Sequence, residues 1–403
     1  MLTGRSAPPR VLVHIVEYHP LFSGHGIYLR RLFPHLLRHG VSVEVLAGDF
    51  GRLVSAETIE GVPVRRLPYS PQAPRREIAH AVRVAGYLVA NRRRFDVVHL
   101  NGFVDTLGLV GQTAHLLGMG VVTQLVLLGA DDPQTVLANY RLPSLRRWAF
   151  LRSDRLLCIS SQLRDSCRQA GIPDSRLVVI PQGVDTQRFE PVSPVVRQEL
   201  RRALELNDQD PVLVFVGAII PRKGVDLLID AWTGVQRELP CATLLLVGPD
   251  KFGPDDQHAA ELNAFVARLK DTVVQRGLRA RFVGRQDAVE TLLQAGDAFV
   301  LPSRHEGFGN VIIEAFACGI PAVVTYMDGV GEATVSDGVN GLVVKGDADL
   351  EGALLLLLRD QRRAREMGVA ARQSAESNFA MPSIAGRYVE VYEAARRARN
   401  RPR

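Results

Sequence analysis

The sequence predicts an α/β protein made of two doubly wound halves, each with a mainly parallel sheet covered by helices. The first observation is length, because 403 residues exceed the usual size of one hydrophobic core. The second is the alternation of short apolar runs with segments of helical spacing. The third is the proline-containing stretch 181–194, after which the alternation begins again. We therefore expect domains at 1–185 and 186–380, with a cleft between them.

The elements of the first half follow this alternation. The first strand is expected at 11–16, and a helix at 27–37 follows it and is closed by Gly40. Later runs are rich in valine, leucine and isoleucine, and helical patterns separate several of them. The further strands are expected at 41–46, 62–66, 95–100, 121–125, 155–159 and 177–180, and the helices at 77–92, 105–117 and 162–170.

The second half repeats the pattern. Strands are expected at 211–217, 242–248, 280–284, 298–301, 321–325 and 341–344, and helices at 225–238, 259–276, 289–294, 349–377 and 383–399. A further helix begins near Asn310 and ends before Gly319 and Pro321. In open sheets of this kind, ligands bind beyond the carboxyl ends of the strands.

Composition excludes several classes of protein. Hydrophobic residues make up 46% and charged residues 23% of the chain, as in soluble globular proteins. No apolar run reaches the roughly 20 residues that a membrane helix needs, and residues 1–10 lack the apolar core of a signal peptide. We therefore expect a cytoplasmic protein. The four cysteines are widely spaced and form no metal or redox motif, so no metal site is expected from them.

Basic residues are concentrated in the first half. Residues 1–185 contain 22 arginines and no lysine against 14 carboxylates, which gives +8, whereas the remainder carries −2 of the net +6. The basic clusters are 75–76, 92–94 and 146–147. Such clusters are typical of solvated helix faces. The alternative is that they attract an anionic acceptor or an anionic membrane surface. Docking at the inner membrane face is therefore an alternative, with 145–152 as a short interfacial segment. Nucleic acid is not expected, because no binding motif accompanies the charge.

The stretch 301–321 predicts an anion site. An apolar strand is followed by a loop with two glycines and then by a helix. The backbone N–H groups of Gly309, Asn310 and Val311 would lie at the helix start, where the helix dipole favours an anion, most often a phosphate. Glu306 and Glu314 flank this position, and carboxylates suit vicinal sugar hydroxyls. The arrangement fits a nucleotide sugar, whereas either glutamate alone is as readily a surface charge.

Two other loops and one strand end carry candidate site residues. Arg222 and Lys223 follow the strand 211–217 and can neutralise a diphosphate, although a basic pair alone is more often a surface feature. His99 and Asn101 are two residues apart and share one face of a strand. Gly24 lies in Ser-Gly-His-Gly, which starts a dinucleotide pattern but has Leu29 where the third glycine belongs. A tight turn without function explains that loop equally well.

Together these motifs resemble the signature of the family 4 glycosyltransferases, which have the GT-B fold of two Rossmann-like domains. The central match is Pro-Ser-x-x-Glu-Gly-Phe-Gly with Glu306 and, seven residues further on, Glu314. The segment 216–229, with Arg222 and Lys223, resembles the family's phosphate loop. Other matches cover nearly the whole chain: 96–99, 153–160, 180–185 and 337–342.

The resemblance implies roles for these positions. Glu314 would bind the ribose hydroxyls of the donor and Glu306 the donor sugar, while Arg222, Lys223 and a helix N-terminus would hold the diphosphate. His99 and Asn101 would lie near the reacting sugar. Further donor contacts are implied for Gly24, Gly284, Arg285, Gly307, Phe308, Gly309, Asn310 and Val311. The family retains anomeric configuration and needs no metal or other cofactor, and the final helix, within 381–403, would cross back to the first domain.

The chain departs from the family pattern on the acceptor side. Asn101 stands where the family often has a second histidine, and asparagine cannot act as an acid or base. Ala218 replaces a common arginine, and Gln182 a common asparagine. A histidine often found near the end of strand 121–125 is absent, and Asp131 and Asp132 follow that strand as candidates for acceptor chemistry.

The sequence therefore predicts a retaining, metal-independent glycosyltransferase. It would move a sugar from a nucleotide-diphosphate sugar, expected to be a UDP-sugar, to a hydroxyl of a glycan, a lipid-linked sugar or a small molecule. Two alternatives remain. A GT-B sugar-nucleotide epimerase would turn over the donor without an acceptor, and a nucleotide-sugar-binding protein would not turn it over.

Overall fold

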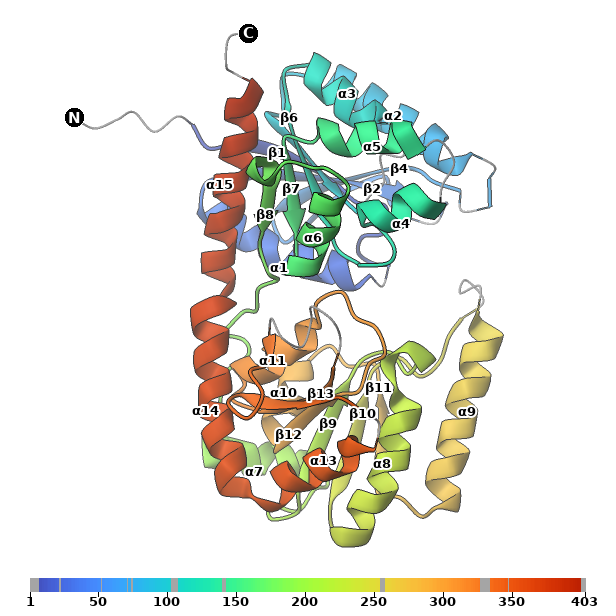
Figure 1. Cartoon of the computed structure of the whole chain (residues 1–403), viewed down its shortest axis with the longest axis vertical. Helices are drawn as coiled ribbons and strands as arrows, with labels where there is room; N and C mark the ends of the chain where they lie inside the picture. Colours follow the sequence, from blue (N-terminus) through green and yellow to red (C-terminus); the bar gives the residue numbers. More distant parts are fainter. Residues whose placement is uncertain are drawn as a thin grey trace, which may run out of the picture. The chain divides into compact units, whose positions relative to one another are not determined.

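The computed structural model describes residues 7–21, 23–51, 53–70, 72–73, 75–102, 108–139, 143–253, 258–326, 334–346 and 348–399. The chain divides into two compact units. Unit 1 comprises residues up to Gly183 together with those from Met381 onward, and unit 2 comprises Val184–Ala380. Figure 1 shows both units as sheets with helices packed against them.

Unit 1 contains an eight-stranded sheet in the order β3-β4-β2-β1-β5-β6-β7-β8. All neighbouring strands are parallel except β3, which pairs antiparallel with β4. The strands are β1 Arg10–His14, β2 Ser42–Asp49, β3 Ala56–Ile59, β4 Val62–Pro68, β5 Val97–Asn101, β6 Gly120–Leu125, β7 Arg155–Cys158 and β8 Leu177–Val179. The helices are α1 Gly24–Arg38, α2 Arg76–Ala90, α3 Leu109–Leu116, α4 Pro133–Asn139, α5 Pro143–Arg152, α6 Ser161–Gln169 and α15 Met381–Arg399.

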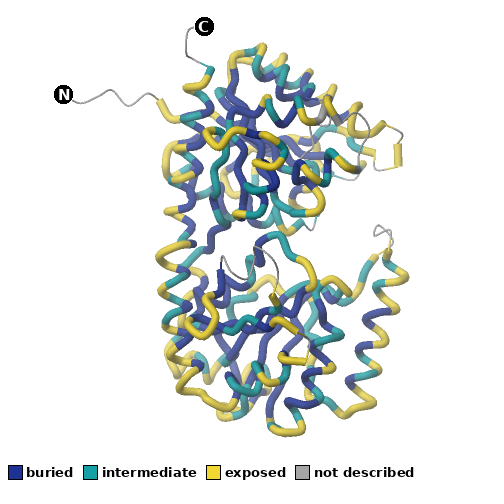
Figure 2. Tube along the Cα trace, viewed as in Figure 1, coloured by how far each residue is buried: buried dark blue, intermediate teal, exposed yellow. Residues whose placement is uncertain are grey.

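Both faces of the unit 1 sheet are buried. Along β1, Val11 and Val13 belong to the core cluster that α1 and α15 cover, whereas Leu12 belongs to the cluster under α2 and α3. This alternation is the two-residue period of a strand. The central strands appear dark blue in Figure 2, beneath helices with exposed outer faces, whereas the edge strands β3 and β8 have no buried residue. Near-continuous apolar strands are typical of parallel sheets covered on both sides.

Unit 2 contains a six-stranded, wholly parallel sheet in the order β11-β10-β9-β12-β13-β14. The strands are β9 Val212–Val216, β10 Thr243–Val247, β11 Ala280–Gly284, β12 Ala298–Leu301, β13 Ala322–Thr325 and β14 Gly341–Val344. The helices are α7 Pro194–Ala203, α8 Val225–Glu238, α9 Ala259–Gln275, α10 Val289–Ala295, α11 Asn310–Ala317, α13 Asp349–Arg359 and α14 Gln361–Asn378. Two sheets of this kind confirm the predicted fold class.

The structure adds elements that the apolar pattern does not predict. Helices α4, α5 and α7 and strand β3 are absent from the expected set, and the helical patterns expected over 349–377 form two helices that meet at Asp360. Helix α7 has an N-cap serine, Ser193, and a proline at its start, but its buried residue is Arg201. Arg201 is 1% exposed and bonds the carboxylate of Asp297 at 2.6 Å. Because Arg201 takes the buried position of α7, the apolar residues of this segment do not show the spacing that predicts a helix.

Two expected segments fall partly outside the described residues. Of the helix expected at 105–117, residues 105–107 are not described, and α3 begins at Leu109. The segment 145–152 lies in α5, but the side chains of residues 145 and 146 are not described. Within the part of the chain that the structure describes, no helix is long and apolar enough to cross a membrane.

Candidate active site

In unit 2 the strand order changes direction between β9 and β12, at the centre of the sheet. Strand β9 pairs with β10 on one side and with β12 on the other. The chain therefore reverses its direction of progress across the sheet between β9 and β12. Ligands of doubly wound sheets bind at this switch point, beyond the carboxyl ends of the strands. The turn Pro221–Lys223 follows β9 and the loop 302–309 follows β12, so both predicted anion-binding segments lie there.

The two segments are packed tightly against each other. A Cβ atom on Gly224 would lie 1.9 Å from the carbonyl oxygen of Pro302, so only glycine permits this approach. The backbone N–H of Arg304 donates to the carbonyl of Arg222 at 2.9 Å. The turn that carries Arg222 and Lys223 is thus fixed against the loop that carries Glu306, although 83 residues separate Lys223 from Glu306.

Glu306 lies where the two cationic side chains meet. Its Oε1 accepts hydrogen bonds from Lys223 Nζ and, at 2.8 Å, from Ser303 Oγ. Its Oε2 lies 3.6 Å from Arg222 Nη1. The Glu306 side chain is only 8% exposed, whereas that of Arg222 is 43% exposed. A carboxylate therefore occupies a place that suits any anion, including a phosphate.

The start of α11 lies directly after this cluster. Gly309 is its N-cap residue, with φ of 78°, and makes no side-chain capping hydrogen bond. The first N–H groups of the helix and the positive end of its dipole therefore suit an anionic ligand. Phe308 is 4% exposed and packs edge-on against Phe379, with ring centroids 6.0 Å apart. Gly307 joins it to Glu306, while Asn310 and Val311 form the first turn of the helix.

Glu314 lies further along α11, on its buried side. The residue is 6% exposed, and its backbone carbonyl accepts from Cys318 N at 3.1 Å. The structure brings Glu314 and Glu306 to one strand–loop–helix unit, as the sequence predicts. Their separate roles toward ribose and sugar remain predictions.

Gly284 and Arg285 lie at a different point along the same edge. Gly284 ends β11, which β10 separates from β9. Gly248, after β10, donates its N–H to the carbonyl of Gly284 at 2.9 Å. A Cβ atom on Gly248 would lie 2.0 Å from the carbonyl oxygen of Gly217, after β9. Three neighbouring strands thus end in glycines that pack backbone against backbone.

Gly248 is a site feature that the sequence reasoning misses. Its signal is a repeated dipeptide, because Val-Gly stands at the end of each strand: Val216-Gly217 at β9, Val247-Gly248 at β10 and Val283-Gly284 at β11. Side chains are absent along this row, so a flat group of a ligand can approach the backbone closely. The contact of Gly284 and Arg285 with a nucleotide base remains a prediction that this row supports.

In unit 1, the corresponding switch point lies between β1 and β5. The loop after β1 leads into α1, where Ser23 Oγ accepts from Gly26 N at 3.3 Å as the N-cap. A Cβ atom on Gly24 would have no described atom within 4 Å. Packing within unit 1 therefore does not require glycine there, and the implied role of Gly24 in donor binding stays a prediction.

His99 and Asn101 share one face of β5, as their spacing predicts, but His99 is placed as a core residue. It is 0% exposed, and its Nδ1 lies 2.9 Å from the hydroxyl of Tyr392 in α15. Burial, with a smaller effect of His25, lowers the pKa of His99 to about 3. His99 is thus a core residue of unit 1, and its implied place near the reacting sugar stays a prediction. It positions β5 against α15.

Asn101 is also held by protein contacts. The residue is 4% exposed, its Oδ1 lies 2.8 Å from Nε2 of His25, and its Nδ2 donates to the carbonyl of His14 at 3.2 Å. Asn101 therefore links the end of β5 to α1 and to the end of β1. Contact between Asn101 and a sugar stays a prediction, and it would use the second lone pair of Oδ1 or the second N–H of Nδ2.

Asp131 and Asp132 fix the loop after β6. Asp131 accepts from Val126 N and Leu127 N at 2.8 and 2.9 Å, and burial raises its pKa to about 6. Asp132 accepts from Thr135 N at 3.1 Å as the N-cap of α4. Although burial acts in the opposite direction, its hydrogen bonds, the first of them with Thr135, keep the pKa of Asp132 below the usual value. Both carboxylates are occupied in organising the loop.

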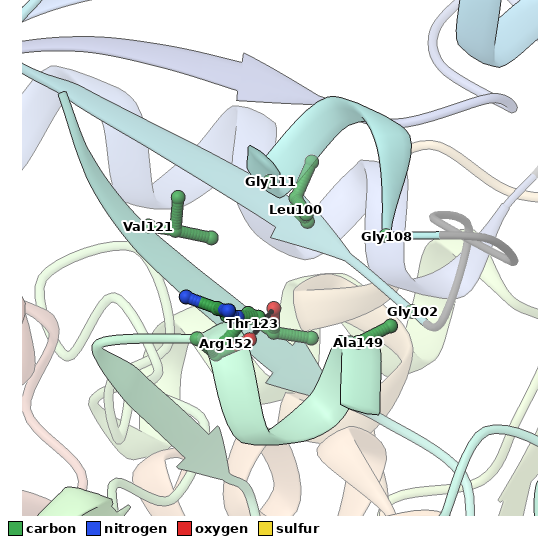
Figure 3. Close-up of a pocket in the computed structure, with 9 residues that line it drawn as sticks. Leu100, Gly102, Gly108, Gly111, Val121, Thr123, Ala149 and Arg152 are labelled. Carbon is green, nitrogen blue, oxygen red and sulfur yellow. Dashed lines mark hydrogen bonds between the residues drawn. The ribbon is translucent and has the colours of Figure 1, made fainter. Parts of the chain in front are cut away.

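A small pocket in unit 1 is lined by residues other than the predicted ones (Figure 3). It lies between the end of β5, the first half of β6 and helices α3 and α5. Thr123 Oγ1 and Ser153 Oγ are within hydrogen-bond distance there, at 2.7 Å. The remaining lining is glycine and aliphatic side chains apart from Arg152. Among the described residues, no group of three His, Cys, Asp or Glu side chains is placed to hold a metal ion.

Comparison with known families identifies both halves of the chain. Residues 196–374 match the model of glycosyl transferases group 1, and residues 23–183 match a glycosyl transferase 4-like domain. A D-inositol 3-phosphate glycosyltransferase of Rhodococcus jostii is 30% identical over 97% of this chain and 90% of that enzyme. The chain belongs to the family 4 glycosyltransferases.

Solved structures place this family 4 glycosyltransferase in the GT-B fold. It superposes on sucrose-phosphate synthase of Thermosynechococcus elongatus with a TM-score of 0.78, at 23% identity over 96% of this chain and 98% of that one. A further relative is the GDP-mannose-dependent alpha-(1-6)-phosphatidylinositol monomannoside mannosyltransferase of Mycolicibacterium smegmatis. It is 34% identical over 61% of this chain, and the match spans 64% of that enzyme.

Proposed function

We propose that the protein is a retaining glycosyltransferase that takes a sugar from a nucleotide-diphosphate sugar and needs no metal ion to do so. The observation that carries the proposal is the cluster of Lys223, Arg222 and Glu306 beside the start of α11. Two cations and a helix N-terminus together supply the charge that a divalent cation supplies elsewhere.

In this proposal the donor diphosphate displaces the Glu306 carboxylate from the cations. Lys223 and Arg222 then bind the diphosphate, with the N–H groups at the start of α11. Glu306, released from Lys223, accepts hydrogen bonds from hydroxyls of the donor sugar. Glu314 binds the ribose, and the row of glycines ending at Gly284 leaves room for the base.

The chemistry follows from where charge grows. As the bond between sugar and diphosphate breaks, negative charge develops on the leaving phosphate, and Lys223 and Arg222 stabilise it. The leaving phosphate takes the proton of the acceptor hydroxyl on the same face of the sugar, so the anomeric configuration is retained. Glu306 is then a positioning group and not a covalent nucleophile.

The donor nucleotide has two candidates. UDP is the first expectation, and the Anabaena protein HepE, which shares the fold at 22% identity, has been solved with UDP and glucose. GDP is the second, because relatives of 34% and 33% identity are named GDP-mannose-dependent. The acceptor is a hydroxyl compound, and the names of relatives include phosphatidylinositol mannosides and inositol phosphate.

A thermal-shift and calorimetric screen against UDP- and GDP-sugars tests the donor assignment. We expect the sugars of one of the two nucleotides to raise the unfolding temperature without added metal. Addition of a metal chelator should leave the affinity of the protein for that donor unchanged. Glu314→Gln should weaken donor binding by about 2 kcal/mol, the cost of a charged hydrogen bond. Unchanged affinity in that variant would remove Glu314 from the ribose site. Turnover of the donor without any acceptor would instead indicate an epimerase.

A further inference from the structure

Ser303 is bonded to the Glu306 carboxylate, three residues further along the loop after β12. Ser303 is 1% exposed, and its Oγ donates a hydrogen bond to Oε1 of Glu306 at 2.8 Å. The proposed function assigns no role to this serine. A side chain that is buried so deeply does not meet a bound sugar directly, so any part that it plays in the reaction is played through Glu306.

The backbone around Ser303 is fixed by the neighbouring elements. The carbonyl of Ser303 accepts a hydrogen bond from Thr325 Oγ1 at 2.7 Å. Thr325 ends β13, which lies beside β12 in the sheet of unit 2 (Figure 1). On the other side, the preceding residue, Pro302, makes the close backbone contact with Gly224. The Ser303 hydroxyl therefore reaches Glu306 from a rigid base.

The partners of Glu306 differ in charge. Among the described residues, Lys223 and Arg222 are its cationic partners, whereas Ser303 donates a neutral hydrogen bond. A bound diphosphate attracts both cations, so neither of them can hold Glu306 while the donor is bound. A hydroxyl carries no net charge and is not drawn away. Because the Glu306 side chain is only 8% exposed, its carboxylate needs a donor that stays.

We propose that Ser303 is a positioning residue, which keeps Oε1 of Glu306 in place when the donor diphosphate draws Lys223 away. The other oxygen, Oε2, is then free to accept hydrogen bonds from hydroxyls of the donor sugar. This inference rests on the proposed function, which places the diphosphate on Lys223 and Arg222 and the sugar on Glu306. It adds a residue that orients the sugar contact and touches neither the sugar nor the phosphates.

Calorimetry with the full chain tests this role, with UDP, UDP-glucose, GDP and GDP-mannose as probes. The quantity measured is the ratio of the affinity for a nucleotide sugar to the affinity for its own diphosphate. Ser303→Ala should lower this ratio about tenfold, the scale of one hydrogen bond to a charged group. Its affinity for the diphosphate alone should stay the same, because both cations remain. Ser193→Ala, which removes the N-cap hydroxyl of α7 in the same unit, is the control. It should lower the unfolding temperature and leave the ratio unchanged.

A double variant separates positioning from a general effect on the loop. In a Glu306→Ala background, Ser303→Ala should lower the ratio no further, because no carboxylate is left to hold. An equal fall in both backgrounds, or loss of diphosphate binding in Ser303→Ala, would overturn the positioning role. An unchanged ratio in Ser303→Ala, when Glu306→Ala lowers it, would overturn it too, and the proposed function would stand. If none of the probes binds, or if Glu306→Ala leaves the ratio unchanged, the proposed donor site fails and the role of Ser303 falls with it.

Discussion

Arg304 donates two parallel hydrogen bonds, of 2.8 and 2.7 Å, to the carboxylate of Asp226 at the start of α8. The same guanidinium donates to the carbonyl of Pro221 at 2.5 Å. Arg304 belongs to the loop of Glu306, and Asp226 follows the turn of Lys223. The pair therefore connects the two segments that form the proposed diphosphate site, without itself belonging to the cationic cluster.

We expect Arg304→Ala to impair catalysis more than stability. A loosened turn would misplace Arg222 and Lys223, and a displacement of 1 Å can cost up to about a hundredfold in rate. An exposed ion pair alone contributes only about 0–1 kcal/mol to folding. Steady-state kinetics should show kcat falling more than KM rises. The control is Arg276→Ala, which breaks a 2.8 Å ion pair with Asp230. Asp230, like Asp226, belongs to α8. Equal effects of the two variants would deny Arg304 a positioning role.

A second prediction concerns Glu306 in the donor-free protein. Its carboxylate neutralises Lys223 and lies near Arg222, so it competes with the incoming diphosphate. Glu306→Gln should therefore bind the nucleotide diphosphate product more tightly, by roughly tenfold, or about 1.4 kcal/mol. Turnover should nevertheless fall, because the charged acceptor for the sugar hydroxyls is lost. Calorimetry with the product separates the two effects, and weaker product binding would show that Glu306 does not compete.

The third prediction tests the leaving-group role of the cations. Arg222→Ala with Lys223→Ala should lower kcat by about 10²–10³, the usual cost of removing a group that stabilises transition-state charge. Lys345→Ala, which removes an exposed lysine after β14, is the control for loss of positive charge. Full activity of the double variant would refute the role that we assign to these cations.

The fourth prediction concerns the row of glycines. Gly248→Ala places a methyl group 2.0 Å from the carbonyl of Gly217, so the ends of β9 and β10 must move apart. We expect a loss of stability of about 1–3 kcal/mol, as for other overpacked sites, together with weaker donor binding. Gly253→Ala, where a Cβ atom has no described neighbour within 4 Å, should change neither quantity. Thermal unfolding and donor titration measure both.

The fifth prediction is a loss of stability in mild acid. Burial lowers the pKa values of His14, His25 and His99 to about 3, 4 and 3 from 6.5. Between about pH 4 and 6.5 the unfolded chain therefore binds more protons than the folded one, so stability is lost as the pH falls through this window. Asp131, with its pKa raised to about 6, acts in the opposite direction, but it is one group against these three histidines and His80, whose pKa burial also lowers.

Thermal unfolding between pH 7 and pH 5 measures this dependence. His99→Gln should flatten it, because glutamine can accept the hydrogen bond of Tyr392 but does not titrate in this range. His258→Gln, at an exposed position before α9, should leave the dependence as it is. An unfolding temperature that stays constant from pH 7 to pH 5 would contradict the prediction.

The sequence predicts the fold class because both sheets are built from apolar runs separated by helical periods, and strands such as β9 and β10 are buried throughout. It does not predict α7, whose buried contact is made by Arg201 and not by an apolar side chain. Strand β3 has no buried residue and therefore no alternating pattern.

The site is predictable to a similar degree. Arg222, Lys223 and Glu306 can be grouped because their loops follow strands of one parallel sheet, and the structure places them in contact. His99 cannot be assigned in this way. Spacing shows which face of β5 it shares with Asn101, but the helix that covers that face, α15, comes about 280 residues later, and its Tyr392 is 293 residues from His99.

Helix α15 follows unit 2 in the chain, yet it completes unit 1. Its Tyr388 and Tyr392 belong to the core that also contains Val11 and Leu29, and Arg399 pairs with Asp154. During synthesis on a ribosome, the first 183 residues must therefore wait for roughly 200 more before the face of their sheet that α1 and α15 share is fully covered. Unit 2, which is continuous in the chain, has no such delay. The unit that is translated first is thus expected to be the last to reach its final stability.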